Sequence, residues 1–323
     1  MPSGKVNNFF YNLNSDFNRL LPVIIPLGVA LGILLPSVFI HLRPYVPWLF
    51  GLMTFSGALK LRAAEFGDTV RRPAPILIFF AVSHILMPLV AMSASSLFFT
   101  DMDLITGYIL LFAGPTAVSG IIWSAILKGD KALCLTLILL DTLFAPLIVP
   151  GTVSVLMGAK TVMNTGGIAI SLLFMVVIPT IIGVTVNEVS KEKISAVVCP
   201  YLDPAAKICL VLVIAANTSP VAPWIRFNDP LIWKAALVCI LLTVTGFMLI
   251  KLVTVIGKIK APKDITLIIS CALKNNSAVM TIAVTFFPEA AALPIMLSIV
   301  FQQMIAAIMG RMFTKEKSTT HTN

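Results

Sequence analysis

The feature that most restricts the fold of this chain is a series of apolar runs, each about 20 residues long, that recur from Leu20 to Phe313. An α-helix of that length spans roughly 30 Å, which is the thickness of the hydrocarbon core of a bilayer. Hydrophobic residues make up 58% of the chain and charged residues 11%, so there is too little polar surface to cover a soluble globule. We therefore expect an all-α polytopic membrane protein. A transmembrane β-barrel would show short, alternating segments instead.

The positions of lysine and arginine predict how the spans are oriented. Nearly all of these residues in the connecting loops fall on one side of the arrangement, and Arg43, Lys160 and Arg226 are the exceptions. Because basic loops stay in the cytoplasm, we expect a cell-membrane protein with both termini cytoplasmic. The net charge of +9 then reflects contact with anionic lipid, and no nucleic-acid partner is expected. The ten predicted spans are 20–42, 46–60, 74–99, 103–127, 131–157, 166–187, 203–218, 230–257, 264–286 and 292–313.

The ten spans divide into two predicted five-helix repeats, residues 20–158 and 166–314. With five spans per repeat, the second repeat would be inverted in the membrane relative to the first, an arrangement that alternating-access carriers often use. The runs VIIPLGVALG around Pro26 and VVIPTIIGVT around Pro179 give modest support. Residues 1–19 are polar with aromatics and are expected to lie along the membrane surface, and residues 315–323 are expected to form a polar tail.

The fourth span of each half contains an interruption that should break its helix. In the first half it reads AGPTAVSG, in which Pro115 removes a backbone donor and clashes with the preceding turn. In the second half it reads LKNNS, beginning at Leu273. Backbone groups freed at membrane depth must face protein or a water-filled cavity. The two breaks predict a polar site near the midplane, although proline and glycine could also merely kink the helices.

Three stretches resemble the bile acid:sodium symporter family and its bacterial relatives. They are GPTAVSGIIWSAILKGDKALCLTLILLDTLFAPLIVP from Gly114 to Pro150, SHILMP from Ser83 to Pro88, and CALKNNSAV from Cys271 to Val279. The resemblance implies ten spans in inverted halves, with crossing broken helices four and nine, and a core domain beside a panel domain. It also implies transport of organic anions such as bile acids, pantoate or pyruvate, usually coupled to sodium.

The chain departs from the pattern of that family where sodium would be held. In the ninth span, Cys271 and Asn275 stand where the family has glutamate and glutamine. In span four, Gly120 and Ile121 stand where the family has serine and asparagine. Cys134, Ile138 and Ser83 stand at further positions where the family has polar residues. Sodium needs several hard oxygen ligands, which thiol and alkyl groups do not supply. We therefore expect that neither of the family's two sodium sites is retained in this chain.

Two ionisable residues have been gained at membrane depth, Lys274 and Asp141. A charge at this depth is costly and is a functional candidate by default. Asp141 lies three residues after Ile138 and so on the same helical face. We hypothesise that the Lys274 ammonium occupies the space of the sodium charge, with Asp141 as its counter-charge. Transport would then be simple facilitated exchange, or coupled to protons if the pair titrates. The alternative is a structural salt bridge between spans five and nine.

The remaining candidate residues are polar groups near the two breaks. Asn276 matches the family asparagine that touches substrate. His84 is a possible proton relay, or otherwise a packing histidine. Gln302 and its neighbour Gln303 in span ten add amides, one of which must point elsewhere. The predicted binding residues for substrate or ion are Thr116, Ser119, Asp141, Lys274, Asn275, Asn276, Ser277 and Gln302.

These residues favour a secondary transporter that carries a small organic anion and does not need sodium. An ordinary sodium-coupled symporter and a transport-inactive sensor with a carrier fold are the alternatives, so sodium or protons are the candidate coupling ions. The spans contain no HExxH, GxSxG or carboxylate dyad, so an enzyme is not expected. The sequence contains no ring of charged residues of the kind that lines a channel, so a channel is not expected. The five cysteines are scattered without a CxxC pair, so neither a structural metal site nor a cofactor is expected.

Overall fold

The computed structural model describes residues 23–62, 73–158, 164–225 and 228–320, and within these ranges the chain is helical and has no β-strand. Six of the described helical segments are long and apolar enough to cross a membrane. This confirms the all-α class and the multi-pass membrane assignment. The six segments are Ala74–Phe98, Lys131–Met157, Thr165–Val189, Lys193–Trp224, Pro230–Ile256 and Glu289–Phe313.

The first two predicted spans form a sharply bent pair of helices. The helix Val23–Leu34 ends before Pro36, and the segment Pro36–Ala58 continues at an angle of 95° to it. That segment consists of α2 (Pro36–Phe39), the 3₁₀ helix η1 (Ile40–Tyr45) and α3 (Val46–Ala58). Proline disfavours helical geometry in the residue before it, which explains the end of the first helix at Leu34. The first helix thus ends at Leu34, eight residues before the end of the predicted span 20–42.

Predicted spans four and nine are each broken into two short helices. Span four comprises α7 (Met102–Ala113) and α8 (Gly120–Ile126). Span nine comprises α14 (Lys263–Ala272) and α15 (Asn276–Phe286). Both breaks fall at the interruptions in the sequence. Each half-helix is too short to cross a bilayer by itself, so the total of ten spans and their inverted repeat stay predictions.

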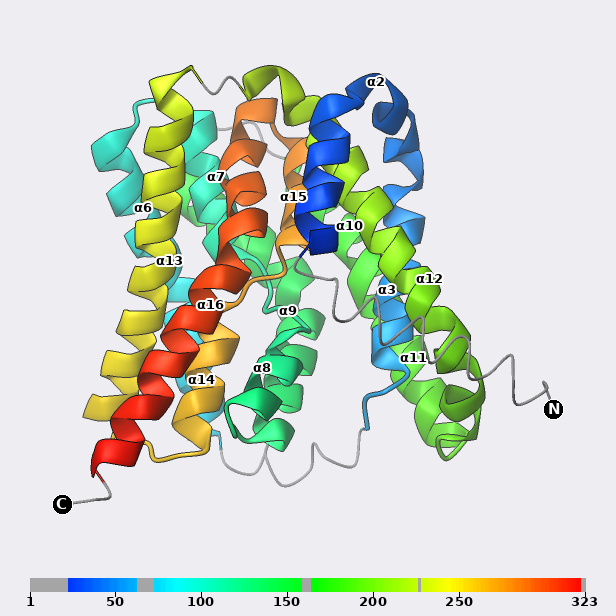
Figure 1. The fold of residues 1–323 in the computed structure, drawn as a ribbon, viewed down its shortest axis with the longest axis vertical. Coiled ribbons are helices and arrows are strands. Elements are labelled where there is room, and N and C mark those ends of the chain that lie inside the picture. Colours follow the sequence, from blue (N-terminus) through cyan, green and yellow to red (C-terminus); the bar gives the residue numbers. More distant parts are fainter. Residues whose placement is uncertain (1–22, 63–72, 159–163, 226–227, 321–323) are drawn as a thin grey trace. The chain divides into compact units, whose positions relative to one another are not determined.

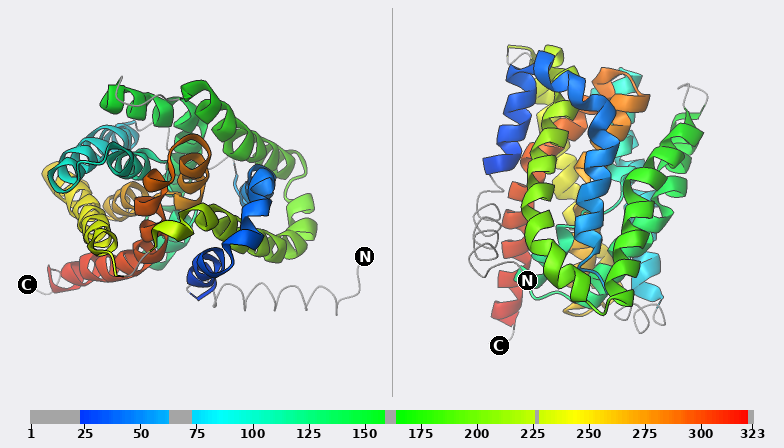
Figure 2. Two further views of the ribbon diagram at one scale, coloured as in Figure 1. Left: turned by 90° about the horizontal axis from the view of Figure 1, so that it is seen from above. Right: turned by 90° about the vertical axis from the view of Figure 1, so that its right-hand side faces the viewer.

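The chain divides into two compact units, each assembled from distant parts of the sequence. The first contains residues 1–63 and 170–225. Within it α3 packs against α12 (Lys193–Thr218) and α11 (Ile178–Val189), as the right-hand view of Figure 2 shows. Lys60 Nζ lies 2.6 Å from an Asp203 carboxylate oxygen and holds the end of α3 to α12. The π-helix η5 (Leu173–Val177) and the 3₁₀ helix η6 (Ser219–Trp224) complete this unit.

The second unit contains residues 64–169 and 226–323, and every predicted site residue lies in it. Figure 1 shows α13 in yellow beside α16 in red, and α13 also packs against α14 and α6. α16 continues as a helix to Thr320, so it includes most of the predicted tail 315–323. The predicted segment 1–19 lies outside the described residues. The other helices of this unit are α5 (Ala74–Phe80), the π-helix η3 (Ala81–Leu86), α6 (Met87–Phe98), α9 (Lys131–Met157), α10 (Thr165–Leu172, which runs on into the first unit), α13 (Pro230–Ile256), η7 (Glu289–Ala292) and α16 (Leu293–Thr320).

Candidate functional site

The two helix breaks meet each other and exchange backbone hydrogen bonds. Asn275 N–H donates to the carbonyl of Pro115 at 2.7 Å, and Ala117 N–H donates to the carbonyl of Leu273 at 2.9 Å. Thr116 and Lys274 face each other across this short antiparallel bridge. Pro115 has no N–H to continue α7, and a hydrocarbon environment supplies no replacement partner. The crossing therefore satisfies peptide groups that both breaks expose.

Thr116 connects the crossing to α9 and α14. Its backbone N–H donates to Asp141 Oδ2 at 2.6 Å. Its hydroxyl is 2.5 Å from the carbonyl oxygen of Ser270 and 3.0 Å from that of Leu273. The side chain of this predicted binding residue is thus engaged with protein carbonyls, and its N–H is the group that meets a charged side chain.

Lys274 is buried at the crossing, with 1% of its surface exposed. Its ammonium donates to the Ser83 hydroxyl at 2.6 Å and lies 3.4 Å from the Ser83 carbonyl. The Gln302 amide pairs with its backbone twice: Lys274 N–H donates to Oε1 at 3.1 Å, and Nε2 donates to the Lys274 carbonyl at 3.0 Å. Both the backbone and the head group of the lysine are therefore held in place.

Asp141 is completely buried on α9, and its close ionic contact is with His84. His84 Nε2 lies 2.7 Å from Asp141 Oδ1, while Asp141 Oδ2 accepts the Thr116 N–H. No direct ion pair joins Asp141 to Lys274 among the described residues. The charged residues of the hypothesis thus share one site, but the immediate partner of the aspartate is the histidine of η3.

The other predicted residues lie along α15 and at the start of α8. Asn276 Nδ2 donates to the Ser298 hydroxyl at 2.9 Å, and Asn275 caps α15 by accepting from Ala278 N–H at 3.3 Å. Ser277 and Ser119, which precedes α8, are half-buried. Ser298 was not among the predicted site residues. It lies four positions before Gln302 and so on the same face of α16, which is the signal that could have identified it.

Replacing Gln302 with Leu is expected to destabilise the protein, because it leaves the buried N–H of Lys274 without its partner and removes one of the two donors to the Lys274 carbonyl, the other being Asn276 N–H. Each unsatisfied group costs about 1–3 kcal/mol. Gln303 is the matched control, since its amide oxygen accepts from the Trp123 indole N–H at 2.8 Å in a partly buried position away from the crossing. Thermal unfolding in detergent should show a clearly larger loss for Gln302→Leu than for Gln303→Leu. Equal losses would contradict this role for Gln302.

Comparison with known proteins identifies similar sequences over most of the chain. The profile described as Sodium Bile acid symporter family matches residues 46–225. The "Uncharacterized protein YbaS" of Bacillus subtilis (strain 168) is 35% identical over 296 residues, which cover 91% of this chain and 97% of that protein. The "Uncharacterized sodium-dependent transporter YocS" of the same strain is 24% identical over 287 residues, covering 89% and 88%. The "Probable sodium/metabolite cotransporter BASS2, chloroplastic" of Oryza sativa subsp. japonica is 27% identical over 177 residues, covering 52% and 41%.

Proposed function

Because this chain belongs to the sodium bile acid symporter family, a family of transporters and not of enzymes, we propose that it carries a small organic anion without needing sodium. In this proposal the ammonium of Lys274 supplies the positive charge that a bound sodium ion supplies in an ordinary symporter. Asp141 is its counter-charge within the same buried site. The protein is then a secondary transporter whose fixed cation belongs to the chain.

The observation that carries this proposal is the burial of Lys274 at the crossing of the two broken helices. An ammonium at this depth costs several kcal/mol of desolvation unless it is compensated, so a role in transport explains its presence better than packing does. α7 and α14 both end at the crossing, and the carboxyl ends of helices favour a cation. A sodium ion beside this ammonium would meet like-charge repulsion.

The residues that replace the family's sodium ligands also argue against a sodium site. Cys134, Ile138 and Cys271 are all buried, and their side chains offer sulfur or carbon where oxygen ligands would be needed. The Ser83 hydroxyl, a hard oxygen at one of the replaced positions, accepts from the Lys274 ammonium. This donor set suits an ammonium better than a sodium ion.

The polar groups at the crossing support an anionic substrate. Asn275, Asn276 and Ser277 form the amino end of α15, where backbone N–H groups and the helix dipole favour negative charge. Asn276 Oδ1 has no hydrogen-bond partner among the described residues, so its amide can still change its contacts when a substrate binds. A carboxylate of modest size is the chemistry that this combination favours.

Two alternatives follow from particular observations. The names of two relatives include "sodium-dependent transporter" and "sodium/metabolite cotransporter", which favours ordinary sodium coupling. A transport-inactive sensor with a carrier fold fits the extensive replacement of the sodium ligands.

Uptake of labelled pyruvate and pantoate into proteoliposomes distinguishes the proposal from both alternatives. Sodium and proton gradients are imposed separately, with empty liposomes as the control. Uptake or counterflow exchange at the same rate with sodium or with choline is expected. A sodium-driven increase would mean that the ordinary symporter mechanism survives. Specific binding of a labelled carboxylate without flux would indicate the sensor.

A further inference from the structure

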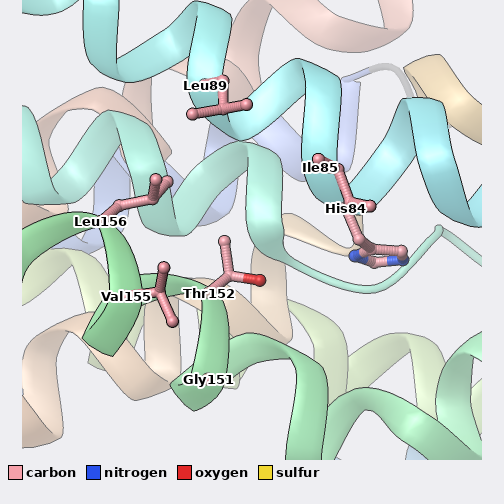
Figure 3. Close-up of a pocket in the computed structure, with 7 residues that line it drawn as sticks. All are labelled: His84, Ile85, Leu89, Gly151, Thr152, Val155 and Leu156. Carbon is pink, nitrogen blue, oxygen red and sulfur yellow. The ribbon is translucent and has the colours of Figure 1, made fainter.

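A pocket of about 290 Å³ in the second unit leads to His84. Figure 3 shows the imidazole of His84 and the hydroxyl of Thr152 on the two sides of this pocket, which is otherwise lined by apolar side chains and Gly151. The volume is large enough for several water molecules at roughly 30 Å³ each. The pocket lies near the carboxyl end of α9, which the predicted topology places at the outer side of the membrane. The lining residues are His84, Ile85, Leu89, Gly151, Thr152, Val155 and Leu156.

The groups beside the pocket retain unused hydrogen-bonding capacity. The His84 side chain is 4% exposed and that of Asp141 is fully buried. Although Nε2 and Oδ1 are 2.7 Å apart, neither ring nitrogen of His84 nor Asp141 Oδ1 makes a hydrogen bond of good geometry among the described residues. Unsatisfied buried polar atoms are rare in native structures and call for an explanation. A histidine also binds and releases protons near neutral pH more readily than other side chains.

We propose that His84 and Asp141 form a proton-binding site, reached through the pocket at Thr152, that loads one proton for each anion carried. This inference rests on the proposed function and adds the coupling ion to it. A hydronium ion that reaches the pocket transfers one proton to the unprotonated ring nitrogen of His84. One O–H bond breaks, one N–H bond forms and neutral water is left, while the other nitrogen faces Asp141. The proton returns to water when the site releases its anion.

The charges in the site explain why proton and anion would move together. With His84 neutral, the charges of Asp141 and Lys274 cancel. With His84 protonated, the site has a net charge of +1, which a monovalent organic anion neutralises. Loading both together leaves the buried site electrically neutral, which avoids the cost of a net charge at membrane depth.

The other titratable groups on the helices packed against η3 do not change this balance. Cys271 on α14 is buried near Lys274 and Asp141 and is uncharged as a thiol. Tyr108 on α7 donates its hydroxyl hydrogen to the Ala235 carbonyl at 2.7 Å. Cys134 on α9 is a buried thiol, and the remaining titratable residues of α7, α9 and α14 lie in the first turns of those helices: Asp103, Lys131, Lys263 and Asp264. α5 and α6 contain no titratable residue, and α5 contributes the rings of Phe79 and Phe80 beside the imidazole.

Asp141 also provides a physical link between the proton site and the crossing. One carboxylate oxygen contacts His84, and the other accepts the backbone N–H of Thr116 in the bridge to Lys274. A change in the charge of His84 therefore changes the strength of a hydrogen bond that positions the crossing. The anion site and the proton site would share this one side chain.

Proton-driven uptake in proteoliposomes gives the first test. An inward proton gradient should raise uptake of labelled pyruvate or pantoate at least fivefold in the unmodified protein, and the ratio with and without the gradient should fall to about one in His84→Gln. Thr152→Phe, which fills the pocket, should reduce the same ratio, whereas the exposed Ser154→Phe on the same helix should not. A gradient effect that persists in His84→Gln overturns the inference, and sodium-independent exchange without any proton effect overturns it while sparing the proposed function.

A second measurement does not depend on transport. The chain has three histidines, so the double variant His41→Gln, His321→Gln leaves His84 as the single imidazole. In ¹⁵N-histidine-labelled protein in lipid nanodiscs, the ring nitrogens should report reversible protonation between about pH 5 and pH 8. Proton exchange between the His84 ring and water should be slower in Thr152→Phe and unchanged in Ser154→Phe. A spectrum that does not change over this range overturns the inference.

Discussion

Replacing Lys274 with Met is expected to lower uptake of the labelled carboxylate at least a hundredfold. The methionine keeps most of the apolar stem but removes the ammonium, so the site keeps the negative charge of Asp141 without its counter-charge. Leaving a buried charge without compensation costs about 3–5 kcal/mol, and each 1.4 kcal/mol corresponds to roughly a tenfold change in an equilibrium. The substrate anion would then have to enter a negatively charged site.

The control for this prediction is Lys131→Met. Lys131 is the first residue of α9 and is exposed, so loss of its charge should change uptake by less than about twofold, because exposed charges contribute little. Thermal unfolding of both variants in detergent separates loss of transport from loss of folding. Uptake by folded Lys274→Met within twofold of the unmodified protein would rule out the fixed-cation mechanism.

Asp141→Asn is expected to destabilise the protein by about 3–5 kcal/mol, and adding Lys274→Met should restore part of that loss. Asparagine keeps the shape of the side chain, but it weakens the hydrogen bond from Thr116 and leaves the lysine charge uncompensated. Removing both charges eliminates the imbalance. A coupling energy of about 0.5–3 kcal/mol between the two positions is expected from a double-mutant cycle of thermal stability.

The matched control for this cycle is Asp130→Asn. Asp130 caps the amino end of α9 by accepting from Leu133 N–H at 3.0 Å, eleven positions before Asp141. Its effects should add to those of Lys274→Met without coupling, because distant sites with no shared partner are independent. Strict additivity for Asp141 and Lys274 as well would mean that the two charges do not compensate each other. It would leave the lysine without its assigned counter-charge.

Much of the fold was predictable from local rules. Apolar length predicted the membrane class, and six long helices confirm it. The interruptions at Pro115 and at Leu273 predicted the breaks after α7 and α14, because proline and runs of polar side chains end helices wherever they occur. The bend at Leu35 was missed, although the same proline rule applies at Pro36. There the apolar run continues across the bend and concealed it.

The partners of the buried polar residues were not predictable in the same way. The sequence marks Asp141 as a costly charge that needs compensation, and it cannot say that η3 brings His84 to 2.7 Å while Lys274 turns to Ser83. Gln302 and Gln303 are equivalent in sequence. They differ because successive residues of α16 face different neighbours, and so Gln302 pairs with Lys274 while Gln303 pairs with Trp123.

The sequence by itself determined that the chain is a helical membrane protein, where two of its helices break, and which residues are too costly to bury without a purpose. These properties depend on apolar length, on proline and on desolvation, and each is set by residues close together in the chain. Only the tertiary structure decided which backbone groups of the two breaks pair with each other and that Asp141 joins His84 to the backbone of Thr116. Such pairings join residues far apart in sequence, and the packing of whole helices selects among many partners of equal chemistry.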